Sequence, residues 1–416
     1  MDEKGIEYLS RKLVQKRSRV LTRYEYYEMK DSQIDKGITI PTELKWLYRA
    51  TLGWCAKTVD SMADRLVFRG FREKSDIFQL NEIFRLNNAD ILFDSAILGA
   101  LISSCDFIDI SEDENGYPRL EVIDGGNATG ILDPFTGLLR EGYAVLERDP
   151  DTKDPIVEAY YLPGEKQIYR KGDKDVETLW NDAPAPLLVP VINRPDSVRP
   201  FGHSRISRAC MYLQAYAKHT LERSEISAEF YSIPQRYVLG MDPEVDYDKW
   251  RATITSMFRV DRDDDGNVPQ LGQFSQQSMQ PFMDQLRTAA SMFAGETGLT
   301  LDDLGFVSQN PSSAEAIKAS HESLRLQARK AQRTFTTGFL NAGYLAACVR
   351  DQYEFHRDQF YTEIGEWEPV FEPDFAALSS IGDGVIKINQ AVPGYVGNDS
   401  LRNLTGIDSD LGDDTF

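Results

Sequence analysis

The residues of the chain best suited to chemistry are three aspartates spaced two apart, Asp261, Asp263 and Asp265, followed by Gly266. This spacing reproduces the first half of an EF-hand calcium loop, in which carboxylate oxygens gather around a sharp glycine turn. The twelfth position of such a loop carries a bidentate glutamate, whereas this sequence has Gly272 there. The sequence therefore favours an acidic surface turn, with a Ca²⁺ or Mg²⁺ site as the alternative.

Ser204, in the stretch FGHSRIS, is the second candidate, because many hydrolases place a nucleophilic serine on a tight strand-to-helix turn. The second glycine of the GxSxG pattern is missing here. A serine in front of a long stretch without proline or glycine suits the N-cap of a helix. The sequence favours this cap, with a serine hydrolase as the alternative.

Other patterns of catalytic or cofactor sites are absent or incomplete. The sequence has neither the GxxxxGKS/T pattern that cradles a triphosphate nor a GxGxxG turn for a dinucleotide. The acidic pair Asp302 and Asp303 in LTLDDLGF has no neighbouring base or electrophile, and the four histidines stand too far apart for an HExxH motif. We therefore expect a protein that is not an enzyme and that needs no cofactor.

The composition indicates a folded chain with an acidic surface. The 416 residues are 41% hydrophobic and 11% aromatic, and the formal net charge is −20. About 100–200 residues form one domain, so two to four modules are expected. Proteins that grip DNA by its phosphates are usually basic or carry a basic stripe. The overall charge argues against a DNA clamp, but it does not argue against a surface past which DNA must slide, since like charges do not adhere.

The cysteines and the apolar stretches indicate the compartment. Four cysteines are scattered without a CxxC pair, which is typical of a reducing compartment. The N-terminus lacks the apolar segment of a signal peptide. The most apolar stretch, 91–102, is shorter than the ~20 residues of a membrane span. We expect a soluble protein, made in the cytoplasm, that does not bind membranes.

The first half of the chain reads as helices followed by an antiparallel β region. Apolar residues at helical spacing predict three helices, over 5–30, 41–57 and 78–103. The stretch FIDISEDENGYPRLEVID predicts a hairpin that turns at Asn115 and Gly116. Further strands are predicted at 143–147, 157–162 and 166–169.

The second half reads as mostly helical. Residues 203–232 lack proline and glycine and predict a long helix that ends before Pro234. A strand-like QRYVLG, a short helix over 247–257 and the acidic turn follow. Further helices are predicted over 280–294, 374–391 and 399–405, with a strand-like EWEPVFEP before the last two and an acidic tail after them.

The segment 312–355 carries the strongest helix signal. Ser312 and Glu315 form a capping box. Behind it two apolar rows repeat every seven residues and form one seam: Ile317, Leu324, Ala331, Gly338 and Leu345, and Ala328, Phe335, Ala342 and Val349. A helix buried in the core of its own chain and a helix at a contact between subunits both explain this seam.

The order of these elements resembles that of the portal proteins of tailed bacteriophages, in particular the siphophage family that infects Gram-positive hosts. Three stretches carry the resemblance: VDSMADRLVFRGF at 59–71, VINRPDSVRPFGHSRIS at 191–207 and GETGLTLDDLGFVSQNPSSAEAIKASHESL at 295–324. The third is the most specific, because it joins a loop to the start of the long helix. The resemblance covers nearly the whole chain, although the C-terminal region is shorter than in larger relatives.

The resemblance implies an α+β portal fold, with an α/β wing, a two-helix stem, a small mixed α/β clip, a tunnel loop, a long kinkable helix and a short helical crown. On this sequence these parts are the wing at 1–202, the stem helices at 203–232 and 279–294, the clip at 233–278, the tunnel loop at 295–311, the long helix at 312–355, and the wing return with the crown and tail at 356–416.

The resemblance also implies a function: a homododecameric ring at the unique capsid vertex of the virion, assembled in the host cytoplasm, which passes double-stranded DNA without sequence specificity. Implied partners are the terminase, the head-completion adaptor, and the major capsid and scaffolding proteins. The alternative is another virion structural protein, a minor capsid or tail component.

Two groups of residues are the candidates for these roles. The tunnel loop would bring Thr300, Asp302, Asp303, Phe306, Gln309 and Asn310 to the channel. The clip would dock terminase or adaptor through Arg236, Lys249, Arg251, Arg259, Asp263 and Asp264.

Overall fold

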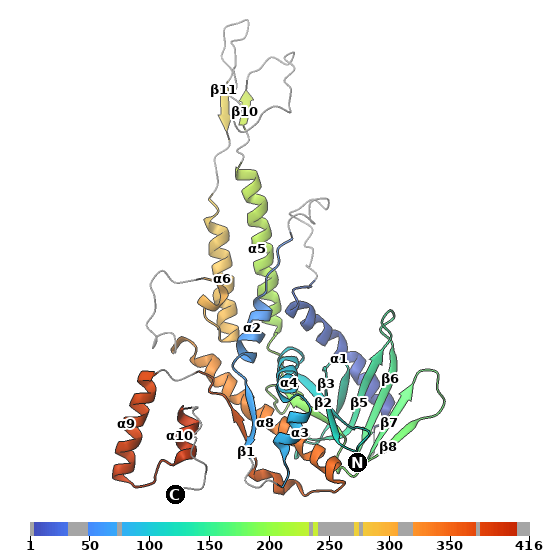
Figure 1. Cartoon of the computed structure of the whole chain (residues 1–416). Helices are drawn as coiled ribbons and strands as arrows, with labels where there is room; N and C mark the ends of the chain where they lie inside the picture. The colour runs from blue at the N-terminus through green and yellow to red at the C-terminus, as the bar shows by residue number, and fades with distance from the viewer. Residues whose placement is uncertain are drawn as a thin grey trace, which may run out of the picture.

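The computed structural model describes residues 4–31, 49–72, 77–232, 236–239, 270–273, 278–306, 319–371 and 375–405. Helices and antiparallel strands share the chain, so the expected α+β class is confirmed. A broad base of helices and sheets carries two long helices, α5 and α6, that stand away from it (Figure 1).

Helix α1 covers a five-stranded antiparallel sheet. The helix spans Ile6–Tyr27, close to the predicted 5–30, and its Leu9 and Leu13 pack on Tyr143, Val145 and Tyr160 of the sheet. The strands lie in sequence order: β4 (Ala128–Leu132), β5 (Leu139–Arg148), β6 (Pro155–Leu162), β7 (Glu165–Arg170) and β8 (Glu177–Trp180). The three strands predicted at 143–147, 157–162 and 166–169 are confirmed.

Two of the predicted helices have other boundaries. The helix predicted over 41–57 is wrong at residues 49–53, which are not helical, and right at residues 54–57, which begin α2 (Trp54–Ala63); residues 41–48 lie outside the described residues. The single helix predicted over 78–103 is two helices, α3 (Leu80–Leu86) and α4 (Ala89–Ser103). Asn88 separates them in the left-handed region at φ 53°, which asparagine tolerates better than most residues. The Asn87 side chain donates to Ile83 O at 2.8 Å and to Pro118 O at 3.0 Å, which ties the break to strand β3.

A three-stranded sheet lies under α4. Its order is β3-β2-β9, with β2 at Cys105–Glu112, β3 at Pro118–Ile123 and β9 at Leu188–Ile192. The hairpin predicted around Asn115 and Gly116 is confirmed, and Gly116 has the positive φ of 78° that its turn needs.

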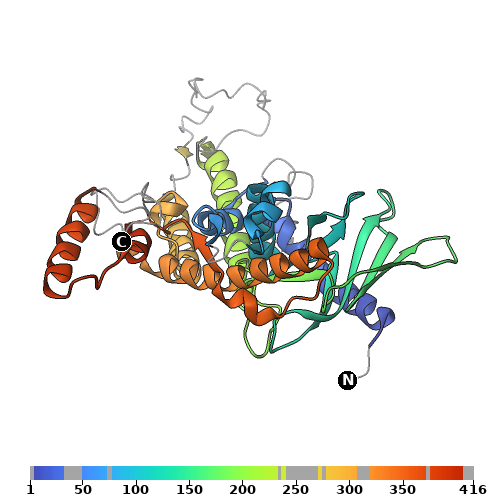
Figure 2. The same ribbon diagram turned by 60° about the horizontal axis from the view of Figure 1, so that its bottom comes forward.

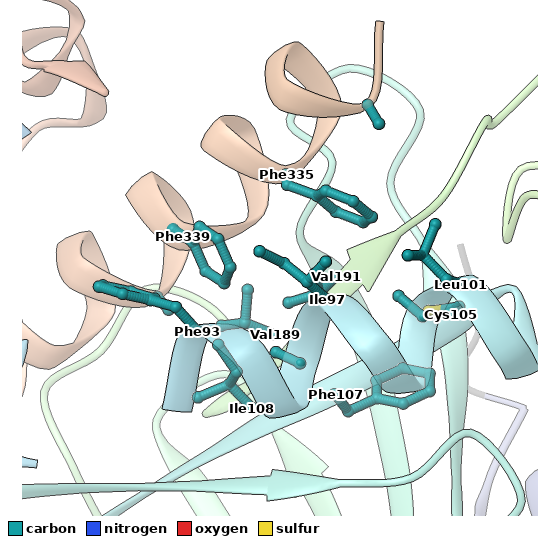
Figure 3. Packing of buried hydrophobic residues seen from close by; sticks show 14 of the residues in the cluster. Phe93, Ile97, Leu101, Cys105, Phe107, Ile108, Val189, Val191, Phe335 and Phe339 are labelled. Atoms are coloured by element: carbon teal, nitrogen blue, oxygen red, sulfur yellow. The ribbon is translucent and has the colours of Figure 1, made fainter. Parts of the chain in front are cut away.

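The long helix α8 (Glu322–Asp351) closes the core over this sheet. Phe335 and Phe339 point toward Phe93 and Ile97 of α4 and toward Val191 of β9 (Figure 3). Every described member of the predicted seam is buried within the chain: Leu324, Ala328, Ala331, Phe335, Gly338, Ala342, Leu345 and Val349. The structure therefore supports the interpretation as a core helix. The helix ends at Asp351 rather than Phe355, and the capping box, like Ile317, lies outside the described residues.

Helices α5 (Arg208–Ser232) and α6 (Gln280–Thr297) pack side by side. Helix α5 begins five residues later than predicted, and α6 ends one turn later. The predicted strand QRYVLG is confirmed as β10 (Arg236–Leu239), which pairs antiparallel with an unpredicted strand, β11 (Gln270–Gln273). This hairpin lies beyond the far ends of the two helices (Figure 1). The short helix predicted over 247–257 lies outside the described residues.

The C-terminal part returns to the base and then leaves it. After the 3₁₀ segment Arg357–Thr362, strand β12 (Ile364–Trp367), close to the predicted EWEPVFEP, pairs antiparallel with β1 (Phe68–Arg72). The helices α9 (Phe375–Ala391) and α10 (Asn398–Thr405) confirm the two predicted helices. They lie on the opposite side of the molecule from the five-stranded sheet (Figure 2).

Candidate functional site

The loop after α6 is held in shape by its own polar groups. Helix α6 ends at Thr297 and is followed by Gly298, whose N–H donates to Ala294 O at 2.9 Å and whose backbone has a left-handed φ of 76°. The carboxylate of Asp303 accepts hydrogen bonds from the Thr300 N–H and hydroxyl, both at 2.8 Å, and the Asp303 N–H donates to the Thr300 hydroxyl at 3.2 Å. A short 3₁₀ helix, Asp302–Leu304, follows from this reciprocal contact.

Apolar side chains fasten the same loop to the core. Leu299 is buried, and Leu301, Leu304 and Phe306 are half-buried against the main cluster. Asp302 is exposed. Of the predicted channel residues, Thr300, Asp303 and Phe306 therefore make contacts that shape or anchor the loop, and Asp302 is the exposed one among those described. Gln309 and Asn310 lie outside the described residues.

The loop also touches the start of α8. His321, which precedes α8, has Nδ1 at 3.7 Å from Asp303 Oδ2. A Cβ added at Gly298 would lie 3.0 Å from the Ser323 hydroxyl oxygen, so glycine allows the close approach of the loop to this helix. The two segments that the resemblance joins, the tunnel loop and the long helix, are in contact.

A buried arginine connects the loop to three distant parts of the chain. The Arg205 side chain is only 6% exposed, and its guanidinium donates to Thr58 O at 3.3 Å, to Thr297 O at 3.0 Å and to the side chain of Gln327. It thus ties α2, the end of α6 and α8 to the segment before α5. Burial lowers the pKa of Arg205 to about 10, which leaves it charged at neutral pH.

This arginine was not among the predicted site residues. The stretch FGHSRIS contains it, but its partners lie 92, 122 and 147 residues away in the sequence. A lone arginine before a helix carries no local pattern that predicts such contacts.

A row of buried polar residues fastens α5 to the N-terminal part of the chain. Gln214, Lys218 and Glu222 lie four residues apart, on one face of the helix, and each is at most 4% exposed. The Gln214 side chain accepts from the Cys55 N–H at 2.7 Å, and the Lys218 ammonium donates to Asp31 at 2.9 Å. Glu222 accepts from the Ala50 N–H at 3.1 Å.

Ser204 is neither a nucleophile nor the helix cap that was predicted. Its hydroxyl is buried and donates to Ile102 O at 2.6 Å. The neighbouring imidazole, His203, is paired with Asp196 at 2.6 Å and is not a partner of Ser204. Ser207 caps α5 instead, since its hydroxyl accepts from the Cys210 N–H at 3.2 Å. The prediction failed because Ser204 is fixed to the end of α4, a contact that is distant in sequence.

The predicted clip residues are mostly outside the described part of the chain. Arg236 is the first residue of β10, opposite Gln273 of β11. The remaining clip and cation candidates lie outside the described residues: Lys249, Arg251, Arg259, Asp261, Asp263, Asp264 and Asp265.

Within the described residues no cluster of three or more His, Cys, Asp or Glu side chains could hold a metal ion. The same residues include no helix with the length and apolar character needed to cross a bilayer. All four cysteines are buried and unpaired.

Two known proteins that resemble this chain in sequence are both phage portal proteins. No protein-family model matches the chain. The portal protein of Mycobacterium phage L5 is 26% identical over 400 residues, which cover 88% of this chain and 80% of that protein. The portal protein of Mycobacterium phage D29 is 25% identical over 398 residues, with the same coverage.

Solved structures give weaker likenesses. A chain from the virion of a native gene transfer agent particle matches 94% of this chain with a TM-score of 0.45 and 14% identity. A chain from the neck of that particle, computed with C12 symmetry, matches with a TM-score of 0.44.

The similarity to the two phage proteins extends over most of both sequences, which a shared motif alone would not produce. It agrees with the resemblance carried by three separate stretches between residues 59 and 324. The chain is a phage portal protein, a structural component of the virion.

Proposed function

We propose that twelve copies of the chain form a closed ring at the unique capsid vertex, and that its axial channel passes double-stranded DNA during packaging and ejection. The observation that carries this proposal is the antiparallel pair α5 and α6, which projects from the base and has the β10–β11 hairpin beyond its ends (Figure 1). A projecting helix pair of this kind gives each copy a long face for its neighbours in a ring.

The parts of the portal fold are assigned on the same basis. We propose a wing at 1–202, a stem made of 203–232 and 279–294, a clip at 233–278 and a tunnel loop at 295–311. The long helix at 312–355 lies behind the loop, and 356–416 form the wing return, a short crown and the tail. In this assignment residues 203–207 precede the first stem helix, which begins at Arg208, and Arg205 fixes them to the base through its hydrogen bonds.

Within the tunnel loop, we assign contact with passing DNA to Asp302. Its side chain is exposed, whereas Asp303 stabilises the loop through Thr300 and Phe306 packs on the core. Each chain carries a formal net charge of −20, so a ring of twelve is strongly acidic. Like charge keeps DNA from adhering to the wall, and a channel that conducts DNA in both directions benefits from weak contact.

The partners follow from the same assignment. The clip, with Arg236 at its base, docks the terminase during packaging and the head-completion adaptor afterwards. The ring meets the major capsid and scaffolding proteins during assembly. The source of force is the terminase, since this chain shows no nucleotide-binding motif. We further propose that the chain belongs to the siphophage portals of Gram-positive hosts, which the resemblance and the two mycobacteriophage relatives support.

Electron microscopy of the purified protein tests the ring. We expect end-on views with twelve-fold or near-twelve-fold symmetry and a central hole wide enough for a duplex. If only monomers form, both with and without the scaffolding protein, the ring is excluded and another virion structural role, a minor capsid or tail component, is favoured.

Charge reversal tests the channel residue. Asp302→Lys should slow DNA packaging or ejection in assembled particles, because a ring of lysines binds phosphates that the acidic ring repels. Asp302→Asn separates the loss of charge from the gain of a cation. Unchanged packaging and ejection in Asp302→Lys particles would exclude Asp302 from the channel wall.

A further inference from the structure

A half-enclosed cavity of about 610 Å³ lies between α1, the segment 199–207 and the start of α5. Its lining includes six lysines and arginines and no aspartate or glutamate: Lys12, Lys16, Arg19, Arg23, Arg199 and Arg208. The whole chain has 66 acidic and 46 basic residues, so this gathering of one sign runs against the overall charge. We call it the basic cavity.

The cations on α1 form a row. Lys12, Lys16, Arg19 and Arg23 are spaced by four, three and four residues, which places them along one face of the helix. At 1.5 Å per residue the row is about 16 Å long. Arg208, in the first turn of α5, lines the same cavity. The cavity therefore offers a line of separate positive charges rather than one point.

The cationic groups form no ion pairs with described carboxylates, although Asp106 and Asp124 lie close enough to Lys16 to oppose in part the lowering of its pKa by burial. The Lys12 ammonium donates to Gly130 O at 2.5 Å and lies 4.9 Å from the centre of the Phe201 ring. Lys16 donates to Ala128 O at 3.4 Å, and Arg23 donates to Ser103 O at 2.5 Å. None of the six lining cations forms an ion pair with a described carboxylate. Carbonyl oxygens and rings orient these groups but do not neutralise them.

The carboxylates nearest to the cavity are occupied elsewhere. Asp106 accepts from the Ser103 hydroxyl at 2.6 Å and from the Gly125 N–H at 2.9 Å, and burial raises its pKa to about 7. Asp124 accepts from the Gly126 N–H at 2.6 Å. At the rim, Asp196 pairs with His203, and Glu296 accepts from the Ser207 hydroxyl at 3.0 Å.

Crowded cations of this kind repel one another. Burial, with smaller contributions from Lys16 and Lys4, lowers the pKa of Lys12 to about 8, and burial also lowers the pKa of Lys16 and of Arg23. A bound anion would relieve this repulsion. The first turn of α5, capped by Ser207, adds the positive end of a long helix dipole to the same wall.

We propose that the basic cavity binds a polyanion that carries successive phosphate groups. A row of lysines and arginines, serine and threonine hydroxyls and a helix N-terminus is the donor set that proteins direct at a phosphate backbone. The lining holds two aromatic rings, Phe201, over which the Lys12 ammonium lies, and His203, which pairs with Asp196, so it offers no row of rings on which successive bases could stack. Recognition is therefore independent of sequence. A DNA strand or a free polyphosphate can supply this chemistry, and only the DNA source depends on the proposed function.

The test is a binding measurement on the full-length protein. We would titrate it into a labelled 20-base-pair duplex, follow the anisotropy at several salt concentrations, and compete with inorganic tripolyphosphate and with polyglutamate. If the cations of the basic cavity neutralise four phosphates, a plot of the logarithm of the binding constant against the logarithm of the salt concentration has a slope of about −3.6, because each phosphate contributes about −0.9.

Two double variants separate the cavity from general charge. Arg19→Gln with Arg208→Gln removes two exposed lining cations, and we expect the slope to become shallower by about 1.8. Arg11→Gln with Arg17→Gln removes the same charge from α1 outside the lining and should leave the slope unchanged. Equal melting temperatures of the two variants without ligand would show that both are folded.

The outcomes are distinct. Duplex binding that tripolyphosphate displaces supports the site for both sources. Binding of the duplex alone supports a DNA backbone, and binding of tripolyphosphate alone supports a free polyphosphate. Equal loss in both double variants, no loss in either, or equal competition by polyglutamate and tripolyphosphate would overturn the proposal. Electron microscopy of the same samples keeps the two ideas apart, since rings without binding leave the proposed function intact.

Discussion

The buried ion pair between Lys218 and Asp31 should be the strongest single link between helix α5 and the N-terminal part of the chain. Its atoms are 2.9 Å apart, and the two side chains are 2% and 3% exposed. We consider Lys218→Met, Asp31→Leu and the double variant, in which an apolar pair replaces the ion pair. Each single variant leaves one charge buried without its partner.

The expected magnitudes follow from burial. Removing one partner of a buried ion pair costs about 3–5 kcal/mol, whereas replacing both with apolar side chains is often neutral or stabilising. The double variant should therefore be far more stable than the sum of the single variants predicts. Arg170–Glu177 is the control, because its atoms are as close, at 2.5 Å, but its side chains are 49% and 46% exposed. Screening by water limits such a pair to about 1 kcal/mol or less.

Urea unfolding of the four proteins of each cycle, followed by tryptophan fluorescence, measures both coupling energies. We expect a coupling of about 3 kcal/mol or more for the buried pair and below about 1 kcal/mol for the exposed pair. Equal coupling energies in the two cycles would refute the reasoning, because burial would then contribute nothing to the strength of the pair.

Three further outcomes are expected. Gly99→Ala should lower the free energy of unfolding by about 2–4 kcal/mol, despite a gain of up to about 1 kcal/mol in helix propensity. The new Cβ would lie 1.7 Å from a carboxylate oxygen of Asp106, and it would displace this carboxylate from its donors, the Ser103 hydroxyl and the Gly125 N–H. Gly295→Ala, with no atom within 4 Å of the new Cβ, should be neutral or stabilising in the same assay, and an equal loss in both would contradict this account. The folded state lowers the pKa of Lys12 from 10.5 to about 8, so it binds fewer protons than the unfolded state between these values, and stability should rise with pH there. Lys12→Met should flatten that rise in melting temperatures measured from pH 7.5 to 10, and identical profiles would show that Lys12 titrates normally. The four buried cysteines, whose pKa values burial raises, should resist Ellman's reagent at pH 8 and react fully in urea, and rapid labelling of the native protein would contradict their burial.

Much of the fold could be predicted from local patterns in the sequence. The seam of α8 repeats every seven residues, so its buried face could be read before the structure, and the turn at Asn115 and Gly116 fixed the first hairpin. The break at Asn88 was missed because apolar residues continue on both sides of it, and only the left-handed backbone ends the first helix. A repeated apolar pattern, as in α8, can be recognised from one sequence. A helix break that depends on the backbone conformation of one residue, as at Asn88, cannot.

The candidate site depended more on contacts that are distant in sequence. Asp302 and Asp303 cannot be told apart in the sequence. In the structure Asp303 accepts a hydrogen bond from the Thr300 hydroxyl, and Asp302 is the more exposed of the two. Arg205 looks like an ordinary surface arginine until Thr58 and the end of α6 close around it. The row of cations on α1 is visible in the sequence, yet its enclosure by the segment before α5 is a property of the fold alone.

The two long helices have a consequence for how such a chain diversifies. The segment between Ser232 and Gln280 leaves the base on α5 and returns on α6, and β10 pairs with β11 just beyond them, so its two ends stay close together. A segment with adjacent ends is topologically an insertion, which proteins tolerate well because its length and sequence can change without altering the rest of the fold. This segment can therefore be exchanged between relatives as a unit. The sequence of this segment and the architecture of the base are then free to evolve at different rates.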